Sequence, residues 1–310
     1  MRIIFMGTPE FAVPCLKRLI DTEELVGVFT QPDKPKGRGY QLAPPPVKLT
    51  ALENNIPVFQ PTSMKDGKAL EIIKSLNAQL IIVVAYGKIL TQDILNSVQY
   101  GCINIHASLL PKYRGAAPIQ WAVLNGDKVT GVTSMQMDSG LDTGDILLSR
   151  SIDISVDMTS GEVHDALSFL GADVMSDTIN LLKENKLKPV KQGESTSDYA
   201  KMLTKDMCPV DFSKPASEVH NHIRGLSPWP VATSSLNGKK IKIHKSKLTN
   251  TRKEDMKYGE IFTKNNSIFV VCGDKLSIEI LKIQEEGKKT MPAEDFLRGH
   301  KIEKNTIMGE

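Results

Sequence analysis

Residues 80–85 read Leu-Ile-Ile-Val-Val-Ala, and this unbroken apolar run is the strongest signal of a buried strand in the chain. A second apolar run, Cys-Ile-Asn-Ile-His, follows at residues 102–106. Short runs of this kind are typical of strands that are covered on both faces. Residues 2–6, 25–30 and 57–60 predict further strands, and the segments 11–20, 47–54 and 69–76 predict helices between them. This alternation indicates a mostly parallel α/β sheet wrapped by helices.

The same α/β pattern continues to about residue 184 and then changes. A helix is predicted at 117–124, a strand pair at 132–137 and 146–154, and a long helix at 160–184. Residues 185–203 are polar and rich in lysine, which predicts a linker between a first domain at 1–184 and a second at 204–310.

The second domain combines one predicted helix with several short strands. The helix covers residues 216–225, and strand patterns follow at 232–236, 240–244, 259–263, 267–272 and 276–283. Asn237-Gly238 between the first two strands is a strong hairpin signal. The pattern favours a small C-terminal β-barrel, plausibly of the OB type, a form that often binds nucleic acids.

Composition excludes several classes of protein. The chain has 310 residues, of which 40% are hydrophobic and 24% charged, as is usual for a soluble globular protein. No apolar run approaches the roughly 20 residues that span a bilayer, so no membrane partner is expected. The first residues enter a strand at once, without the pattern of a signal peptide or a presequence, which predicts a cytoplasmic protein, most simply of a bacterial cytosol. The four cysteines are far apart and form no metal-binding pattern, so we expect free thiols and no metal.

Positive charge gathers in the second domain. The net charge is +3 overall, but it is +5 for residues 204–310 and −2 for residues 1–203. A basic patch fits a polyanionic partner, although a solvated charged surface is an equally good interpretation of charge alone. A second basic stretch, residues 31–48, is a Pro- and Gly-rich segment that is unusually long for a connection between a strand and a helix.

Two polar side chains interrupt the apolar run at 102–106. Asn104 and His106 are two residues apart, so they project from the same face of the strand. They lie at its carboxyl end, where open α/β sheets bind their ligands. The segment Gly-Leu-Asp-Thr-Gly at 140–144 could bring Asp142 beside them. An amide, an imidazole and a carboxylate together suit acyl transfer, in which an oxyanion is stabilised and protons move.

Each of these residues also has a structural interpretation when it is taken singly. Asn104 could satisfy the end of a strand, His106 could sit in the core, and Asp142 could occupy a turn. Together they favour a catalytic site. No G-x-G-x-x-G fingerprint follows the first strand, where residues 7–9 read Gly-Thr-Pro, so a nicotinamide or flavin cofactor loses its main support.

Several motifs now point to one family. C-I-N-I-H-A-S-L-L-P-K-Y-R-G-A-A-P-I-Q-W at 102–121 and M-D-S-G-L-D-T-G-D-I-L at 137–147 resemble the 10-formyltetrahydrofolate-dependent formyltransferases. R-I-I-F-M-G-T-P-E-F-A at 2–12, Q-P-D-K-P-K-G-R-G at 31–39 and S-P-W-P-V-A at 227–232 narrow the resemblance to the branch that formylates initiator methionyl-tRNA. The resemblance runs from residue 1 to about 283.

The resemblance implies a Rossmann-like formyltransferase domain, a linker and a C-terminal β-barrel. It also implies a reaction: the α-amino group of methionine, esterified to initiator tRNA, attacks the formyl carbon of 10-formyltetrahydrofolate. Asn104 and His106 are then the donors to the tetrahedral oxyanion. Asp142 holds His106, favours its charged form and helps to move protons. No metal is needed.

The family also assigns binding residues for the folate and the tRNA. The folate-binding segment corresponds to Ser108, Leu109, Leu110 and Pro111, with Ala85, Tyr86 and Gly87 lining the pterin pocket mainly through backbone groups. The 31–48 segment, carrying Lys34, Lys36 and Arg38, corresponds to the insertion that enters the acceptor stem, and Lys205 is a second candidate contact. The barrel lysines Lys240, Lys242 and Lys245 would hold phosphates of the acceptor arm. For Tyr113-Arg114-Gly115, a structural turn and a direct ligand contact are equally plausible.

Some features depart from the family, and other functions remain open. Val210-Asp211-Phe212 replaces an I-D-W-like signal, and Met207-Cys208-Pro209 is untypical, which leaves the local packing after the linker open. A formyltransferase for glycinamide ribonucleotide or an amino sugar, a formyltetrahydrofolate hydrolase and a catalytically silent RNA-binding protein are the alternatives. The basic segments argue against the first two, and the intact trio argues against the third. We expect a monomer.

Overall fold

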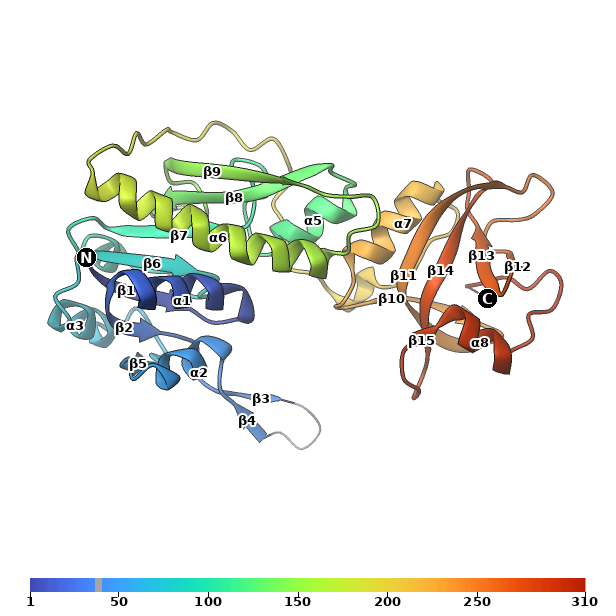
Figure 1. Ribbon diagram of the computed structural model, residues 1–310, viewed down its shortest axis with the longest axis horizontal. Helices are drawn as coiled ribbons and strands as arrows, with labels where there is room; N and C mark the ends of the chain where they lie inside the picture. The colour runs from blue at the N-terminus through green and yellow to red at the C-terminus, as the bar shows by residue number, and fades with distance from the viewer. Residues whose placement is uncertain (37–40, 310) are drawn as a thin grey trace. The chain divides into compact units, whose positions relative to one another are not determined.

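The computed structural model describes residues 1–36 and 41–309 (Figure 1). Contacts between residues divide the chain into two compact units. One contains Met1–Gly115, Gly131–Ile152 and His164–Tyr199, and the other contains Ala116–Thr130, Asp153–Val163 and Ala200–Glu310. The chain thus passes between the units several times, whereas the sequence pattern predicts two contiguous domains. The boundaries at 184 and 203 stay a prediction.

The first unit is built on a seven-stranded sheet with the order β5-β2-β1-β6-β7-β8-β9. Its strands are β1 (Arg2–Gly7), β2 (Glu24–Phe29), β5 (Val58–Phe59), β6 (Leu80–Val84), β7 (Cys102–His106), β8 (Val129–Gln136) and β9 (Ile146–Asp153). β1 pairs in parallel with β2 and β6, and β6 with β7, whereas β7 and β8 are antiparallel. The predicted mostly parallel α/β class is therefore confirmed, and the antiparallel pairing of β8 makes the sheet mixed.

Helices accompany this sheet (Figure 1). They are η1 (Glu10–Ala12), α1 (Val13–Thr22), α2 (Pro46–Glu53), α3 (Lys68–Ser75), α4 (Gln92–Leu95) and α6 (Ser160–Lys183). α1 shows why they form: Cys15, Leu16 and Leu19 fall at helical spacing and are buried. In β1 the side chains of Ile3, Ile4, Phe5 and Met6 are all 0% exposed, as expected for a central strand covered on both faces.

The 31–48 segment, predicted to be a long Pro- and Gly-rich loop, contains short regular structure. β3 (Lys34–Lys36) and β4 (Gln41–Ala43) pair antiparallel, and α2 begins at Pro46, inside the expected loop. α2 confirms the helix predicted at 47–54, and Pro46 suits its first turn because a proline lacks the N–H that the first turn leaves unpaired. The strands β3 and β4, of three residues each, were not predicted. Arg38, singled out by the sequence, lies outside the described residues.

The second unit is built on an antiparallel sheet in the order β10-β11-β14-β13-β12, to which β15 adds through β14. Its strands are β10 (Ala232–Leu236), β11 (Lys239–Arg252), β12 (Ile261–Lys264), β13 (Ser267–Val271), β14 (Leu276–Glu285) and β15 (Met291–Pro292), and its helices are α5 (Pro118–Leu124), η2 (Lys205–Met207), α7 (Ala216–Gly225) and α8 (Ala293–Gly299). Asn237 and Gly238 join β10 and β11 with positive φ angles of 51° and 73°, so the predicted hairpin is confirmed. Closure into a barrel stays a prediction.

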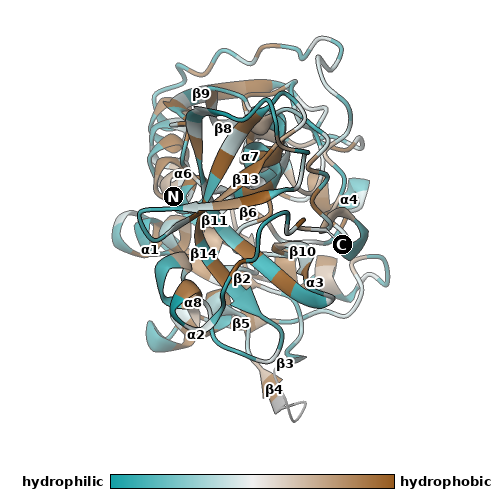
Figure 2. Cartoon of the chain, turned by 90° about the vertical axis from the view of Figure 1, so that its right-hand side faces the viewer, coloured by the Kyte–Doolittle hydropathy of each residue, from teal (hydrophilic) through white to brown (hydrophobic). Residues whose placement is uncertain are grey.

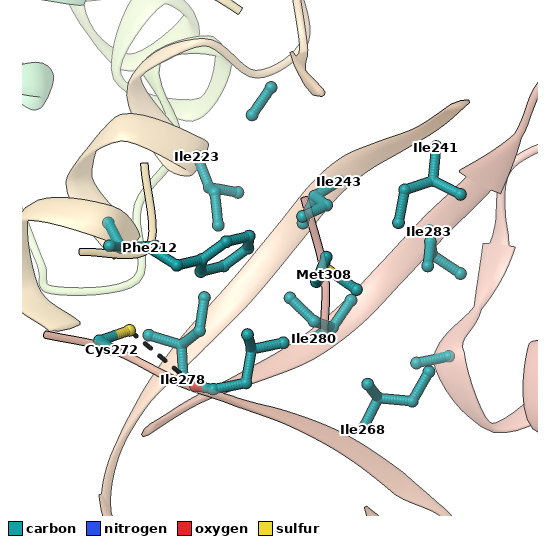
Figure 3. Close-up of a cluster of buried hydrophobic side chains, with 14 of the residues drawn as sticks. Phe212, Ile223, Ile241, Ile243, Ile268, Cys272, Ile278, Ile280, Ile283 and Met308 are labelled. Atoms are coloured by element: carbon teal, nitrogen blue, oxygen red, sulfur yellow. Dashed lines mark hydrogen bonds between the residues drawn. The ribbon is translucent and has the colours of Figure 1, made fainter. Parts of the chain in front are cut away.

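Alternating apolar residues of these strands form the core of the second unit. Figure 3 shows Ile243 from β11 and Ile278 and Ile280 from β14 in one cluster with Ile223 from α7 and Phe212. β11 is longer than its predicted span, because register shifts between Ile243 and Lys245 and beyond let it continue past His244. In Figure 2 the strands carry brown, apolar segments, while many of the loops are teal.

The composition led us to expect no membrane-spanning segment, free cysteines and no metal site. Among residues 1–36 and 41–309, no helix is both long enough and apolar enough to cross a bilayer. The four cysteines are free and buried. Within the same ranges, no group of three or more histidine, cysteine, aspartate or glutamate side chains is arranged to hold a metal ion.

Candidate active site

Two neighbouring strands position the predicted catalytic residues. Asn104 and His106 lie on β7, and their partners on β8 are Met135 and Thr133. Asp142 lies in the loop that joins β8 to β9. β8 runs antiparallel to β7 and ends at Gln136, opposite Ile103, so the loop after β8 starts near the amino end of β7. From there it folds back to bring Asp142 to Asn104.

The Asp142 carboxylate is held by three neighbours. Its Oδ1 accepts a long hydrogen bond of 3.4 Å from Asn104 Nδ2. Its Oδ2 accepts a bond of 2.9 Å from the backbone N–H of Gly115 and lies 3.8 Å from His106 Nδ1. The structure thus brings Asn104, His106 and Asp142 together around one carboxylate, as the sequence predicts.

The imidazole of His106 is fixed from its other side. Its Nε2 lies 3.0 Å from the backbone oxygen of Tyr113. A carbonyl oxygen only accepts, so Nε2 carries the proton of that hydrogen bond and Nδ1 is the nitrogen that faces Asp142. The side chain of His106 is 7% exposed and that of Asp142 is 18% exposed, so both groups are shielded while the carboxylate keeps some access to solvent.

The loop that carries Asp142 has an unusual backbone. Asp142 has a φ of 55°, in the left-handed region that residues with a side chain rarely adopt. Two residues on, a Cβ on Gly144 would lie 1.7 Å from the carbonyl oxygen of Gln136. The close approach of the loop to the end of β8 therefore requires glycine at 144, which explains part of the Gly-Leu-Asp-Thr-Gly pattern.

The predicted folate-binding segment follows directly after β7 and is anchored to β8 through Thr133. Thr133 Oγ1 donates to the backbone oxygen of Ser108 at 2.8 Å and accepts from the N–H of Leu110 at 3.2 Å. Ser108 Oγ donates to the carbonyl of Lys112 at 2.7 Å. Leu109 is half-buried, and Pro111 follows a cis peptide bond. The hydroxyl of Ser108 thus serves the loop itself.

The second predicted folate segment, residues 85–87, follows β6. Tyr86 is 2% exposed, its hydroxyl lies 3.4 Å from Met64 Sδ, and burial raises the pKa of its phenol. Its side chain belongs to the core. Ala85 and Gly87 are exposed. What this segment can offer to a ligand is backbone, together with the surface of Ala85 and Gly87.

A residue of the predicted linker, missed by sequence reasoning, contacts this site. Gln192 Nε2 donates to the backbone oxygens of Asp142 and Gly144, at 2.9 and 2.7 Å. Its Oε1 accepts from Arg114 Nε and Nη2, at 3.1 and 2.8 Å. These bonds favour the structural interpretation of Arg114. The linker sequence is polar throughout, and nothing in it distinguishes Gln192.

Three of the predicted tRNA-binding lysines lie near one point of the second unit. Burial raises the pKa of the Cys208 thiol, the charges of Lys240, Lys205 and Lys242 lower it, and that of Asp206 raises it. The segments are joined because the N–H of Thr233 on β10 donates to the carbonyl of Cys208 at 2.7 Å. Across residues 1–36 and 41–309, none of the three has an acidic partner within salt-bridge distance.

The remaining predicted contacts are distributed differently. Lys245 lies 3.5 Å from Glu162, so its charge is partly compensated. Lys34 is exposed on β3, and the backbone of Lys36 ends the same strand.

The arrangement is that of an acyl-transfer site. An amide donor, a histidine nitrogen and a carboxylate converge beside a backbone loop, where a tetrahedral oxyanion could be stabilised and a proton accepted. The amide, the imidazole and the carboxylate can perform these roles without a metal ion.

Comparison with known proteins defines the class. The model of the formyl transferase family matches residues 1–179, and that of the formyl transferase C-terminal domain matches residues 202–301. A solved N-formyltransferase from Helicobacter canadensis, in complex with folinic acid and dTDP-3-aminofucose, has a TM-score of 0.68 with 21% identity and covers 91% of this chain and 98% of its own. That similarity shows the shared fold.

Full-length relatives give the particular family. Methionyl-tRNA formyltransferase from Clostridium novyi is 49% identical over 309 residues, which cover 99% of this chain and 100% of the relative. The protein of the same name from Alkaliphilus oremlandii is 49% identical over 311 residues, covering 100% of both. The chain belongs to the methionyl-tRNA formyltransferase family.

Proposed function

We propose that this enzyme transfers the formyl group of 10-formyltetrahydrofolate to the α-amino group of methionine on initiator methionyl-tRNA and so makes N-formylmethionyl-tRNA. The observation that carries the proposal is the convergence of Asn104, His106 and Asp142 at the end of β7. Membership of the family and full-length similarity to its named members support the choice of substrates.

The proposed chemistry follows from the positions of the polar atoms. The amine attacks the formyl carbon, and negative charge develops on the former carbonyl oxygen. Asn104 Nδ2 donates to that oxygen, and a protonated His106 Nδ1 is the second donor, because Nε2 is already engaged with the carbonyl of Tyr113. Asp142 stabilises the charge on His106 through the 3.8 Å contact.

The protons of the reaction need an acceptor and a donor. The ammonium group of methionine loses one proton before the free amine attacks, and the nitrogen loses a second proton as the amide forms. The leaving nitrogen of the folate gains one proton, and the other passes to water. The Asp142 carboxylate is partly exposed and can take a proton directly or through water, and the same proton can return to the folate nitrogen. No covalent intermediate with the enzyme is required.

The substrates would occupy the surfaces already described. Residues 108–111 and 85–87 would hold the folate, largely through backbone groups. Lys205, Lys240 and Lys242, which form no salt bridge within residues 1–36 and 41–309, are suited to phosphates, and Lys34, Lys36 and Arg38 would approach the acceptor stem. We propose this allocation together with a monomeric, cytosolic enzyme, as expected from the sequence.

The acceptor is tested by offering two substrates in parallel. Labelled 10-formyltetrahydrofolate is given to the enzyme with methionyl initiator tRNA and with glycinamide ribonucleotide, and release of label to water is measured in both. We expect label on the aminoacyl-tRNA. Label on the ribonucleotide would retain the catalytic trio but overturn the tRNA assignment, and release to water alone would indicate a hydrolase.

A further inference from the structure

The segment that follows α6 does more than connect two parts of the chain. It runs beside two loops of the active site and bonds to both of them. Val190 and Ile146 exchange backbone hydrogen bonds of 2.8 and 2.9 Å, which pin the segment to the start of β9. From that point it contributes the side chains of Gln192, Ser195 and Ser197 to the loops that carry the catalytic groups.

Gln192 supports the loop of Asp142. One amide nitrogen donates to the carbonyl oxygen of Asp142, the residue with the left-handed backbone, and to that of Gly144, two residues further on. A conformation of this kind persists only where the surroundings hold it. Arg114 in turn fixes the amide by donating twice to Gln192 Oε1, and it also donates to the carbonyl of Gly193 at 2.9 Å.

Ser195 and Ser197 support the loop that holds His106. Ser197 Oγ accepts from the N–H of Tyr113 at 2.7 Å, and Ser195 Oγ donates to the carbonyl of Pro111 at 3.0 Å. The carbonyl of Tyr113 is the group that fixes His106 Nε2. The same segment thus holds the partner of the imidazole and the backbone of the carboxylate.

We propose that Gln192 is a positioning residue for catalysis: it acts through Asp142, by fixing the turn that aims the carboxylate at Asn104 and His106. The proposal rests on the proposed function, because its effect is read in formyl transfer. Gln192 itself reaches two backbone oxygens and an arginine, so it touches none of the reacting atoms.

Gln192→Glu tests the role with little change of shape. The carboxylate keeps an acceptor for Arg114 but replaces the donor with an oxygen that faces two carbonyl oxygens. We expect kcat to fall by about 10- to 100-fold, as for other displaced catalytic groups, while KM for the folate stays nearly constant. Gln136→Glu is the matched control, because Gln136 Nε2 also donates to two backbone oxygens, those of Tyr100 and Cys102.

A double-mutant cycle separates positioning from general support of the fold. If Gln192 acts through Asp142, then Gln192→Glu costs little further activity in an Asp142→Asn background. The same loss in both backgrounds, or equal losses of kcat for Gln192→Glu and Gln136→Glu, would overturn the proposal. A wild-type enzyme that transfers no formyl group to methionyl-tRNA would instead overturn the proposed function.

Discussion

Among single residues, Asp142 is the one on which the proposed chemistry depends, and its carboxylate has three neighbours. One carboxylate oxygen of Asp142 accepts a hydrogen bond from Asn104. The other accepts a hydrogen bond from the N–H of Gly115 and lies near His106 Nδ1. Asn104 therefore has two roles in the proposed mechanism: it orients Asp142, and it donates a hydrogen bond to the oxyanion. A residue with both roles is expected to be more costly to remove than its single long hydrogen bond suggests.

Asn104→Ala tests this expectation. Removing one oxyanion donor typically lowers kcat by about 10²–10³-fold, and we expect a loss in that range. The comparison is Asn96→Ala, which removes an exposed amide at the end of α4 that bonds only Gln92 among the described residues. Rates are measured with saturating folate and tRNA. An Asn104→Ala enzyme as active as Asn96→Ala would remove Asn104 from the mechanism.

The sequence predicts the catalytic trio because strand periodicity is local. Asn104 and His106 are two residues apart on one strand, so their shared face follows from the pleat alone. Gln192 shows the limit of such reasoning. Its contacts depend on where a polar segment returns, some fifty residues after Asp142, and no periodicity encodes that return. The burial of the Tyr86 side chain could not be predicted either, because an aromatic side chain at the end of a strand can pack in the core or lie on the surface.

At the scale of elements, the pairing of β8 with its neighbours depends on a glycine. A Cβ on Gly131 would lie 2.1 Å from the carbonyl oxygen of Arg150 on β9 and 2.5 Å from a side-chain carbon of Leu109. The carbonyl of Arg150 cannot move aside as a flexible side chain can, so an added Cβ would force β8 and β9 apart.

Gly131→Ala should therefore destabilise the enzyme by about 1–3 kcal/mol, as overpacking does. Gly299→Ala is the control, because no atom lies within 4 Å of the added Cβ at the end of α8. Chemical denaturation of the two variants measures the free energy of unfolding. Equal stabilities would show that β8 and β9 can shift apart without cost.

The end of β14 carries a second element-scale prediction, on pH. Hydrogen bonds from Lys288 and Lys239 lower the pKa of Glu285 from 4.5 to about 2, and His300 Nε2 lies 3.1 Å from the same carboxylate. A carboxyl group with a lowered pKa stabilises the fold above its unfolded pKa. The stabilisation is present above about pH 4.5 and is lost as the pH falls towards 2.

Glu285→Gln removes that titration. The variant should lose less stability than the wild type between pH 4.5 and 2, measured as thermal unfolding midpoints across the range. Glu286→Gln, a change at the exposed neighbouring residue, should leave the wild-type pH dependence in place. Parallel pH curves for Glu285→Gln and the wild type would contradict the role given to this ion cluster.

Most elements were predictable because each has its own periodicity, and the exceptions have physical causes. β3 and β4 are three residues each, too short for a pattern. α8 lies in the stretch after residue 283, which offered no motif, and its burial of Ala293 and Phe296 depends on the sheet beneath it. The full length of β11 depends on register shifts that a strict alternation of residues hides.

For the whole molecule, the sequence predicts which region carries the excess positive charge, but it does not predict which of the lysines have acidic partners. The excess of lysine and arginine beyond residue 203 was evident from counting. Counting does not show which of these lysines lack an acidic partner. Lys205, Lys240 and Lys242 converge because the segment at Cys208 pairs with β10, whereas Lys245 finds Glu162.

The salt dependence of tRNA binding distinguishes these lysines. Lys240→Ala should weaken binding and lower the slope of log Kd against log salt concentration by about 1, as expected for the loss of one phosphate contact. Lys245→Ala should change the slope less, because its ammonium group already has an acidic partner. A larger change for Lys245 than for Lys240 would contradict the assignment of the free lysines to phosphates.

Asp142 is proposed to serve the chemical step of formyl transfer. The decisive measurement is single-turnover transfer of labelled formyl to methionyl initiator tRNA by Asp142→Ala and by the wild type, with the tRNA affinity measured for both proteins. We predict at least a roughly 100-fold loss of the transfer rate with tRNA affinity nearly unchanged. An Asp142→Ala enzyme that keeps most of its transfer rate would contradict the account.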